Sequence, residues 1–134
     1  MTQAKPMTEE QQQQWTREQY QVATKYLATK GLITQSVAVE ESRYLVPILA
    51  IWKLNLNDGS KVWVLCGDLP TDHSNFDVAP SAREALRHFA LKWQMQAENL
   101  FRADDKSQND FANLLVSRSE GLYQLYDDET LWQK

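Results

Sequence analysis

Residues 44–56 read YLVPILAIWKLNL, residues 57–60 read NDGS and residues 61–67 read KVWVLCG. The first run is apolar on both faces in its first half and then alternates, which is typical of a strand covered on both sides at one end. Asp58-Gly59 supplies the positive-φ positions of a tight turn. We therefore expect a central hairpin at about 44–56 and 61–67. Pro47 cannot donate to a ladder, so an unpaired stretch or bulge is expected there.

Helical patterns lie on both sides of this hairpin. A capping box at Thr8 opens a predicted helix over 8–30, which ends before Gly31. A second capping box opens a predicted helix over 81–103. In it, the Ser81 side chain would accept from the Glu84 N–H, and the Glu84 carboxylate would accept from the Ser81 N–H.

Two more helices and one more strand complete the expected fold. Apolar residues continue at helical spacing over 107–126, a short turn is expected over 128–132, and 33–39 is a possible third strand. No alternating βαβ pattern is present. The order predicts an α+β fold, in which a small antiparallel sheet packs against three to four helices.

Length and composition fit one small domain. With 134 residues, 43% hydrophobic and 24% charged, the chain resembles an average globular protein. We expect a disordered tail at 1–7 and a single domain at 8–134. Cys66 is the only cysteine and no apolar run is long enough to span a bilayer, so we expect a cytoplasmic protein that has no membrane partner.

The charge distribution argues against nucleic acid. The net charge is −4; residues 1–67 carry seven basic and six acidic side chains, and residues 68–134 carry seven and twelve. A nucleic-acid binder needs a stripe of Lys and Arg to displace phosphate counterions, and neither half supplies one.

The loop at 67–73 is the first candidate site. It places Asp68, Asp72 and His73 directly after a predicted strand end, where they could bind an anion or a metal or act as acid and base. The simpler interpretation is that the carboxylates cap turns and that His73 is solvated. No spacing here matches a defined metal motif, and we predict no bound metal.

A second candidate is the first half of the helix over 81–103. Arg83 and Arg87 are four residues apart, as are Glu84 and His88, so each pair shares a helix face. If the loop at 67–73 folds over this helix, the two groups would form one pocket for an anion or a polar ligand. The simpler interpretation is a solvated face.

Five tryptophans are many for this length. Periodicity predicts Trp52 and Trp93 in the core, together with Cys66 as a small buried hydrophobe. Trp63 and Trp132 are expected to be exposed and are candidates for surface recognition. Signatures of serine hydrolases, P-loops, dinucleotide binding and zinc proteases are absent, so no catalytic residue and no cofactor are predicted.

The chain resembles a family of small, mainly proteobacterial proteins known as a domain of unknown function. The resemblance runs nearly end to end and rests on residues 15–20, 39–47, 67–73, 82–89 and 110–115. It implies a small bacterial protein and carries over no activity, substrate or catalytic residue.

The missing enzyme signatures, the aromatic residues and the acidic second half favour a non-catalytic binding or protein-interaction module. The alternative is a small enzyme or a metal- or anion-dependent binder that uses the 68–73 loop and the 83–88 helix face. Self-association is compatible with either hypothesis.

Overall fold

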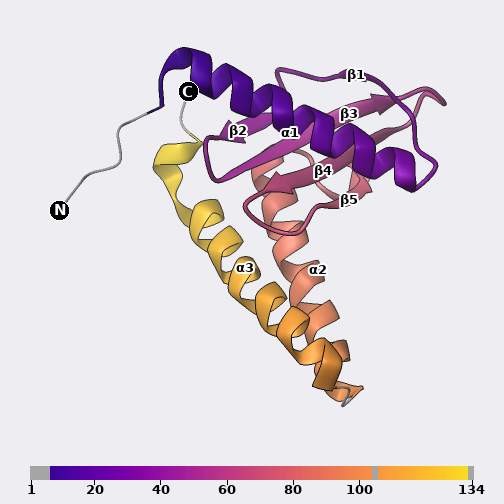
Figure 1. Ribbon diagram of the computed structural model, residues 1–134, viewed down its shortest axis with the longest axis vertical. Helices are drawn as coiled ribbons and strands as arrows, with labels where there is room; N and C mark the ends of the chain where they lie inside the picture. Colours follow the sequence, from indigo (N-terminus) through magenta and orange to yellow (C-terminus); the bar gives the residue numbers. More distant parts are fainter. Residues whose placement is uncertain (1–6, 104–105, 133–134) are drawn as a thin grey trace. The chain divides into compact units, whose positions relative to one another are not determined.

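The computed structural model describes residues 7–103 and 106–132, so residues 1–6 of the expected tail at 1–7 lie outside the described residues. The chain divides into two compact units, the first ending at Phe76 and the second beginning at Asp77. The first unit contains one helix and the sheet, and the second contains two long helices (Figure 1). The α+β prediction is confirmed; whether the two units fold as one domain stays a prediction.

The sheet of the first unit has five antiparallel strands, which are β1 (Thr34–Val37), β2 (Arg43–Leu45), β3 (Leu49–Leu56), β4 (Lys61–Gly67) and β5 (Asp72–Asn75). Their order is β1-β3-β4-β5, and β2 also pairs with β3. The central hairpin β3–β4 pairs Trp52 with Val64 and Asn55 with Lys61. Gly59 in its turn has φ +89°, as the Asp-Gly signal predicts.

The prediction of a single strand over 44–56 is wrong, because this segment contains part of one strand, β2, and the whole of another, β3. The chain reverses at residues 46–48, where the Ile48 N–H donates to the Leu45 carbonyl (2.7 Å) and the Val46–Pro47 peptide is cis. Tyr44 consequently pairs with Ala50 in the β2–β3 ladder. A half-buried edge strand has an apolar sequence like that of the buried strand that follows, so the sequence pattern hides the reversal.

The expected loop at 67–73 is also partly wrong, because its last two residues belong to strand β5 (Asp72–Asn75). Its backbone pairs with β4, with His73 opposite Val64 and Asp72 opposite Leu65. An edge strand that is only half buried tolerates polar side chains, so hydrophobic alternation is missing from this segment.

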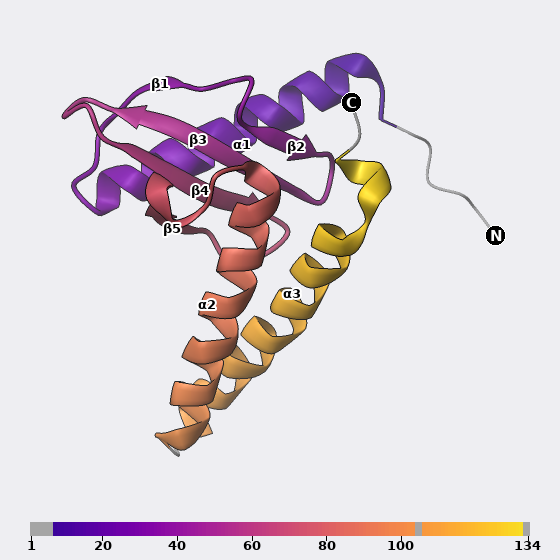
Figure 2. The same cartoon turned by 180° about the vertical axis from the view of Figure 1, so that it is seen from behind.

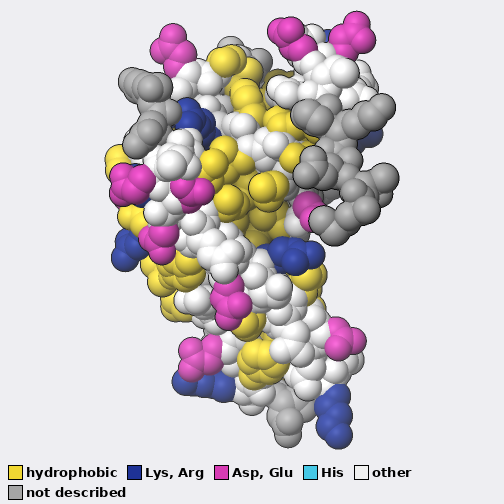
Figure 3. Space-filling view, turned by 90° about the vertical axis from the view of Figure 1, so that its left-hand side faces the viewer, with side chains coloured by type: hydrophobic (Ala, Val, Ile, Leu, Met, Phe, Trp, Pro, Cys, Tyr) yellow, Lys and Arg dark blue, Asp and Glu magenta, His cyan; other side chains and the backbone are white. Residues whose placement is uncertain are grey.

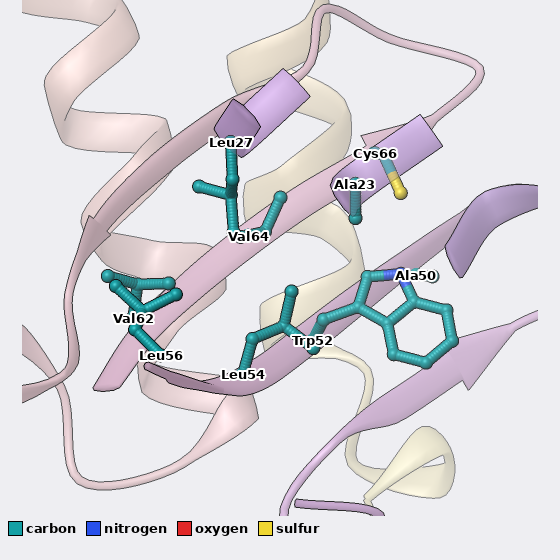
Figure 4. Packing of buried hydrophobic residues seen from close by; sticks show 9 residues of the cluster. All are labelled: Ala23, Leu27, Ala50, Trp52, Leu54, Leu56, Val62, Val64 and Cys66. Carbon is teal, nitrogen blue, oxygen red and sulfur yellow. The ribbon is translucent and has the colours of Figure 1, made fainter. Parts of the chain in front are cut away.

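Helix α1 (Glu9–Thr29) lies across one face of the sheet (Figure 1). The predicted capping box is formed: the Gln11 N–H donates to the Thr8 side chain, and the Gln11 amide oxygen accepts from the Thr8 N–H. Ala23 and Leu27 of α1 are fully buried against strand residues (Figure 4). The strand members of this cluster, which include the predicted core residues Trp52 and Cys66, are Ala50, Trp52, Leu54, Leu56, Val62, Val64 and Cys66.

The second unit is built on a helical hairpin. Helices α2 (Ala82–Arg102) and α3 (Asn109–Asp127) lie side by side (Figure 2), and short 3-10 turns occur at Phe76–Val78, Lys106–Gln108 and Glu129–Leu131. Buried residues recur along α2 at helical spacing, with Trp93 among them as predicted. In the parts of the chain that the structure describes, no helix is both long and apolar enough to cross a membrane.

Candidate functional site

The polar residues of the 68–73 segment are largely used by the fold. Asp68 is exposed, and its backbone N–H donates to the Ile48 carbonyl (2.9 Å). The Asp72 carboxylate accepts a hydrogen bond from the N–H of its neighbour His73 (2.8 Å). This local bond is typical of the turn-capping role that carboxylates take near strand ends.

His73 joins the edge strand to α1. Its Nδ1 lies 3.0 Å from the Tyr26 hydroxyl, and the two rings meet edge to face with centroids 5.4 Å apart. Burial, and then the negative charge of Asp72, raise the pKa of Tyr26. The phenol therefore stays protonated at neutral pH and serves as a structural partner of the imidazole.

Arg83, from the second candidate group, donates a hydrogen bond to a backbone carbonyl at the C-terminal end of α3. Arg83 Nε donates to the Tyr126 carbonyl (2.9 Å), and its guanidinium lies over the rings of Tyr126 (5.2 Å) and Trp132 (6.0 Å). The Trp132 indole donates to the Leu125 carbonyl (3.0 Å). The last carbonyls of a helix have no partner within it, so these two side chains act as a C-terminal cap.

Glu84 also differs from its prediction. Ser81 accepts from the Glu84 N–H (3.2 Å), which is half of the expected capping box, but the Glu84 carboxylate accepts a bond from the Tyr126 hydroxyl (3.0 Å). This bond is the main reason that the pKa of Tyr126 is raised. Arg87 is exposed, and the half-buried His88 ring contacts Phe89 at a centroid distance of 5.6 Å.

The two predicted groups thus belong to different compact units, with Asp68, Asp72 and His73 in the first and Arg83, Arg87 and His88 in the second. Within residues 7–103 and 106–132, no group of three or more His, Cys, Asp or Glu side chains is arranged to hold a metal ion.

Trp63 is not the exposed residue that its strand face suggests. Its side chain is 1% exposed, its indole N–H donates to the Phe76 carbonyl (3.1 Å), and Lys53 Nζ lies 5.8 Å from the ring centroid. The prediction of exposure is wrong because this face of the sheet is covered as well as the α1 face: Leu49 and Ile51 are also fully buried. Trp132 is half buried.

An open groove of about 660 Å³ lies in the first unit, between the first half of α1 and the strands. Its α1 residues are Glu9, Gln12, Gln13, Thr16, Arg17 and Tyr20. Its other lining residues, from the strands and the turn after β2, are Val37, Tyr44, Val46 and Trp52. Figure 3 shows a face of the molecule on which hydrophobic side chains gather, with basic and acidic side chains beside them.

Three aromatic rings form the floor of this groove. The Trp52 ring meets Tyr44 at a centroid distance of 4.8 Å and Tyr20 at 5.4 Å. Burial raises the pKa of Tyr44, and a hydrogen bond with Ser42 opposes that rise. Contacting rings hold one another in place, so the floor presents a preformed apolar surface.

The Trp52 indole N–H is buried, and among the described residues it has no hydrogen bond of good geometry. The Cys66 thiol interacts with the Trp52 indole. Burial raises the pKa of this thiol to about 11, and the interaction with Trp52 opposes that rise. Unused buried donors are uncommon in folded proteins, where most are bonded.

Sequence reasoning missed this groove, although its signals were present. Tyr20 falls inside the helix predicted over 8–30 and Tyr44 inside the strand predicted over 44–56, so neither position indicates a binding surface. The available signal was the spacing of Gln13, Arg17 and Tyr20, which are four and three residues apart and so share one face of the helix.

No curated protein and no solved structure matches this chain. A family model does match, over residues 9–132, which includes α1, all five strands, α2 and α3. The match confirms the resemblance to a domain of unknown function and spans both compact units. The chain belongs to the family described as Domain of unknown function (DUF4826).

Proposed function

We propose that this chain is a non-catalytic binding protein whose groove, between α1 and the strands, holds the apolar part of a small amphipathic molecule. The observation that carries the proposal is the aromatic floor of Tyr20, Tyr44 and Trp52 beneath a rim of glutamine, threonine and arginine side chains. Ligand sites in proteins commonly combine an apolar lining with a few polar groups.

The size of the groove supports a small ligand. Its volume of about 660 Å³ lies within the range of roughly 300–1,000 Å³ that small-molecule sites occupy. The sole cysteine is buried and reduced, so we place this binding in the cytoplasm.

The groove suits this proposal better than the two polar groups that the sequence singled out. His73 is engaged by Tyr26, and Arg83 caps α3, so a ligand at either position would compete with an existing contact. The groove can accept a ligand without breaking any of these bonds.

A groove-filling variant tests the proposal. Thr16 and Thr24 are both half-buried residues of α1 whose hydroxyls donate to a helix carbonyl, and only Thr16 lines the groove. We expect ligand-observed NMR with a library of amphipathic metabolites to find compounds that bind the wild type and Thr24→Trp but not Thr16→Trp.

Equal binding by Thr16→Trp, or no binder for the wild type, would overturn the proposal. Conversion of a bound compound into a product by the purified protein would instead favour the small-enzyme hypothesis. The matched Thr24→Trp variant controls for the effect of a bulky residue on α1.

A further inference from the structure

We propose that the ligand of the groove is a small amphipathic carboxylate. Its carboxylate is held by Arg17 and Gln13, and its apolar body lies on the floor formed by Tyr20, Tyr44 and Trp52. This inference rests on the proposed function and adds the charge and the orientation of the ligand.

Most amides at the start of α1 are already engaged by the fold. The side chains of Gln11, Gln12 and Gln14 form hydrogen bonds of 2.9 Å, 3.2 Å and 3.1 Å within the helix or to the residues just before it. By contrast, Gln13 and Arg17 make no hydrogen bond or ion pair with any residue that the structure describes. Their donors are therefore available to a ligand.

These two side chains also lie at a border between apolar and polar surface. They are four residues apart and so share one face of the helix. Both line the apolar groove, and both line a smaller hollow of about 460 Å³ whose other lining residues are Glu10, Gln11 and Gln14. The head group of an amphipathic molecule fits such a border, with its tail toward the rings.

The charge at this position selects an anion. A guanidinium matches the geometry of a carboxylate and can bind both of its oxygens, and the Gln13 amide adds a neutral donor. One cation beside one amide suits a singly charged carboxylate better than a doubly charged phosphate.

The acidic residue of the groove lining lies too far away to cancel this preference. Glu9 precedes Arg17 by eight residues, which is about 12 Å along the helix axis. That separation exceeds the Debye length of about 8 Å at physiological salt, as does the separation of about 10 Å for Glu10, which lines the smaller hollow. Both carboxylates are therefore largely screened from Arg17.

A pair of matched compounds tests the inference. We would measure the dissociation constants of octanoate and 1-octanol by titration calorimetry with the wild type, Arg17→Gln, Arg102→Gln and Thr16→Trp. Arg102 is an exposed arginine of α2, ion-paired with Glu98, so its variant controls for the loss of one surface charge.

We expect the wild type and Arg102→Gln to bind octanoate about fivefold more tightly than octanol, because exposed ion pairs contribute modestly. Arg17→Gln should bind both compounds alike. At about 1 M NaCl, where the Debye length is about 3 Å, the preference of the wild type should shrink toward one.

Two failures can be told apart. If the wild type binds both compounds equally and Thr16→Trp binds neither, the carboxylate inference is overturned while the groove remains a binding site. The same holds if Arg17→Gln keeps the preference for octanoate. If Thr16→Trp binds as well as the wild type does, the groove itself is overturned.

Discussion

The groove in the first unit and the Arg83 cluster in the second are made of the same kinds of residue. Each combines an arginine, a tryptophan and at least one tyrosine. At the Arg83 cluster, the donors are bonded to carbonyl or carboxylate groups of α2, α3 and the turn that follows. At the groove, the Trp52 N–H and the Arg17 guanidinium have no such acceptor among the described residues.

The two regions differ in whether their polar donors are hydrogen-bonded within the fold. A bonded donor stabilises the fold, and removing it leaves its acceptor unsatisfied. An unbonded donor on an exposed side chain, such as Arg17, contributes little to folding and is available to a ligand. Residue type alone does not distinguish a bonded donor from an unbonded one. The contacts of each side chain in the structure do distinguish them.

The largest effect concerns the thiol beneath the groove floor. Cys66 has a pKa raised from 9.0 to about 11 by burial, so the folded state keeps a proton that the unfolded state loses. The free energy of unfolding should therefore fall by about 2 to 3 kcal/mol between pH 9 and pH 11. Urea unfolding at several pH values checks this.

Cys66→Ala is the control for that measurement. Tyrosines with raised pKa titrate in both proteins, so the difference between their pH profiles isolates the thiol. A wild-type profile parallel to that of Cys66→Ala would mean that water reaches the thiol, and the groove floor would then not be a dry surface.

The two arginines give the next largest effect. Arg83→Gln should lower the free energy of unfolding by about 1–2 kcal/mol, because the variant loses a charged donor to the Tyr126 carbonyl at a side chain that is 29% exposed. Arg17→Gln should change it by less than about 0.5 kcal/mol. Urea unfolding measures both changes. If the two variants lose similar amounts of unfolding free energy, the proposed difference between the two regions is contradicted.

The two buried tryptophans of the first unit test the same contrast for indole groups. Trp52 is 3% exposed and Trp63 1% exposed, but only the Trp63 N–H has an acceptor of good geometry. Substitution by Phe removes similar volume at each site, so Trp63→Phe should cost about 1 kcal/mol more than Trp52→Phe. A larger cost for Trp52→Phe would reveal a hydrogen bond hidden in the groove floor.

The smallest effect concerns two tyrosines of α1. Tyr26→Phe removes the bond to His73 and should lower the free energy of unfolding by about 0.5–1 kcal/mol. Tyr20→Phe, at a groove residue whose hydroxyl has no described hydrogen bond, should leave it nearly unchanged. Thermal unfolding of both variants checks this, and a greater loss at Tyr20 would contradict it.

The sequence was sufficient for elements that local chemistry specifies. Thr8 with Gln11, Ser81, and the Asp-Gly turn each fix a helix start or a hairpin through neighbouring residues, and all were predicted at the right positions. Two turns between consecutive strands were missed, because neither carries an Asn-Gly or Asp-Gly signal. The reversal at Pro47 pairs β2 with the next strand, β3, and the turn after Gly67 pairs β5 with the preceding strand, β4.

The candidate site was harder to predict because its decisive contacts are long-range. His73 and Arg83 have the composition of a site, but contacts from residues more than forty positions away decide that they are structural. The groove brings α1 together with β1, β2 and β3, so its residues are far apart in the chain and form no motif.

The most direct test of the groove follows the five tryptophan indole signals in proton–nitrogen NMR spectra during titration with octanoate. Tryptophan-to-phenylalanine variants assign them. We predict that the Trp52 signal shifts progressively to saturation while the Trp63 and Trp132 signals stay in place, because only Trp52 of these three lines the groove. A saturating shift at Trp132 with none at Trp52 would contradict the account.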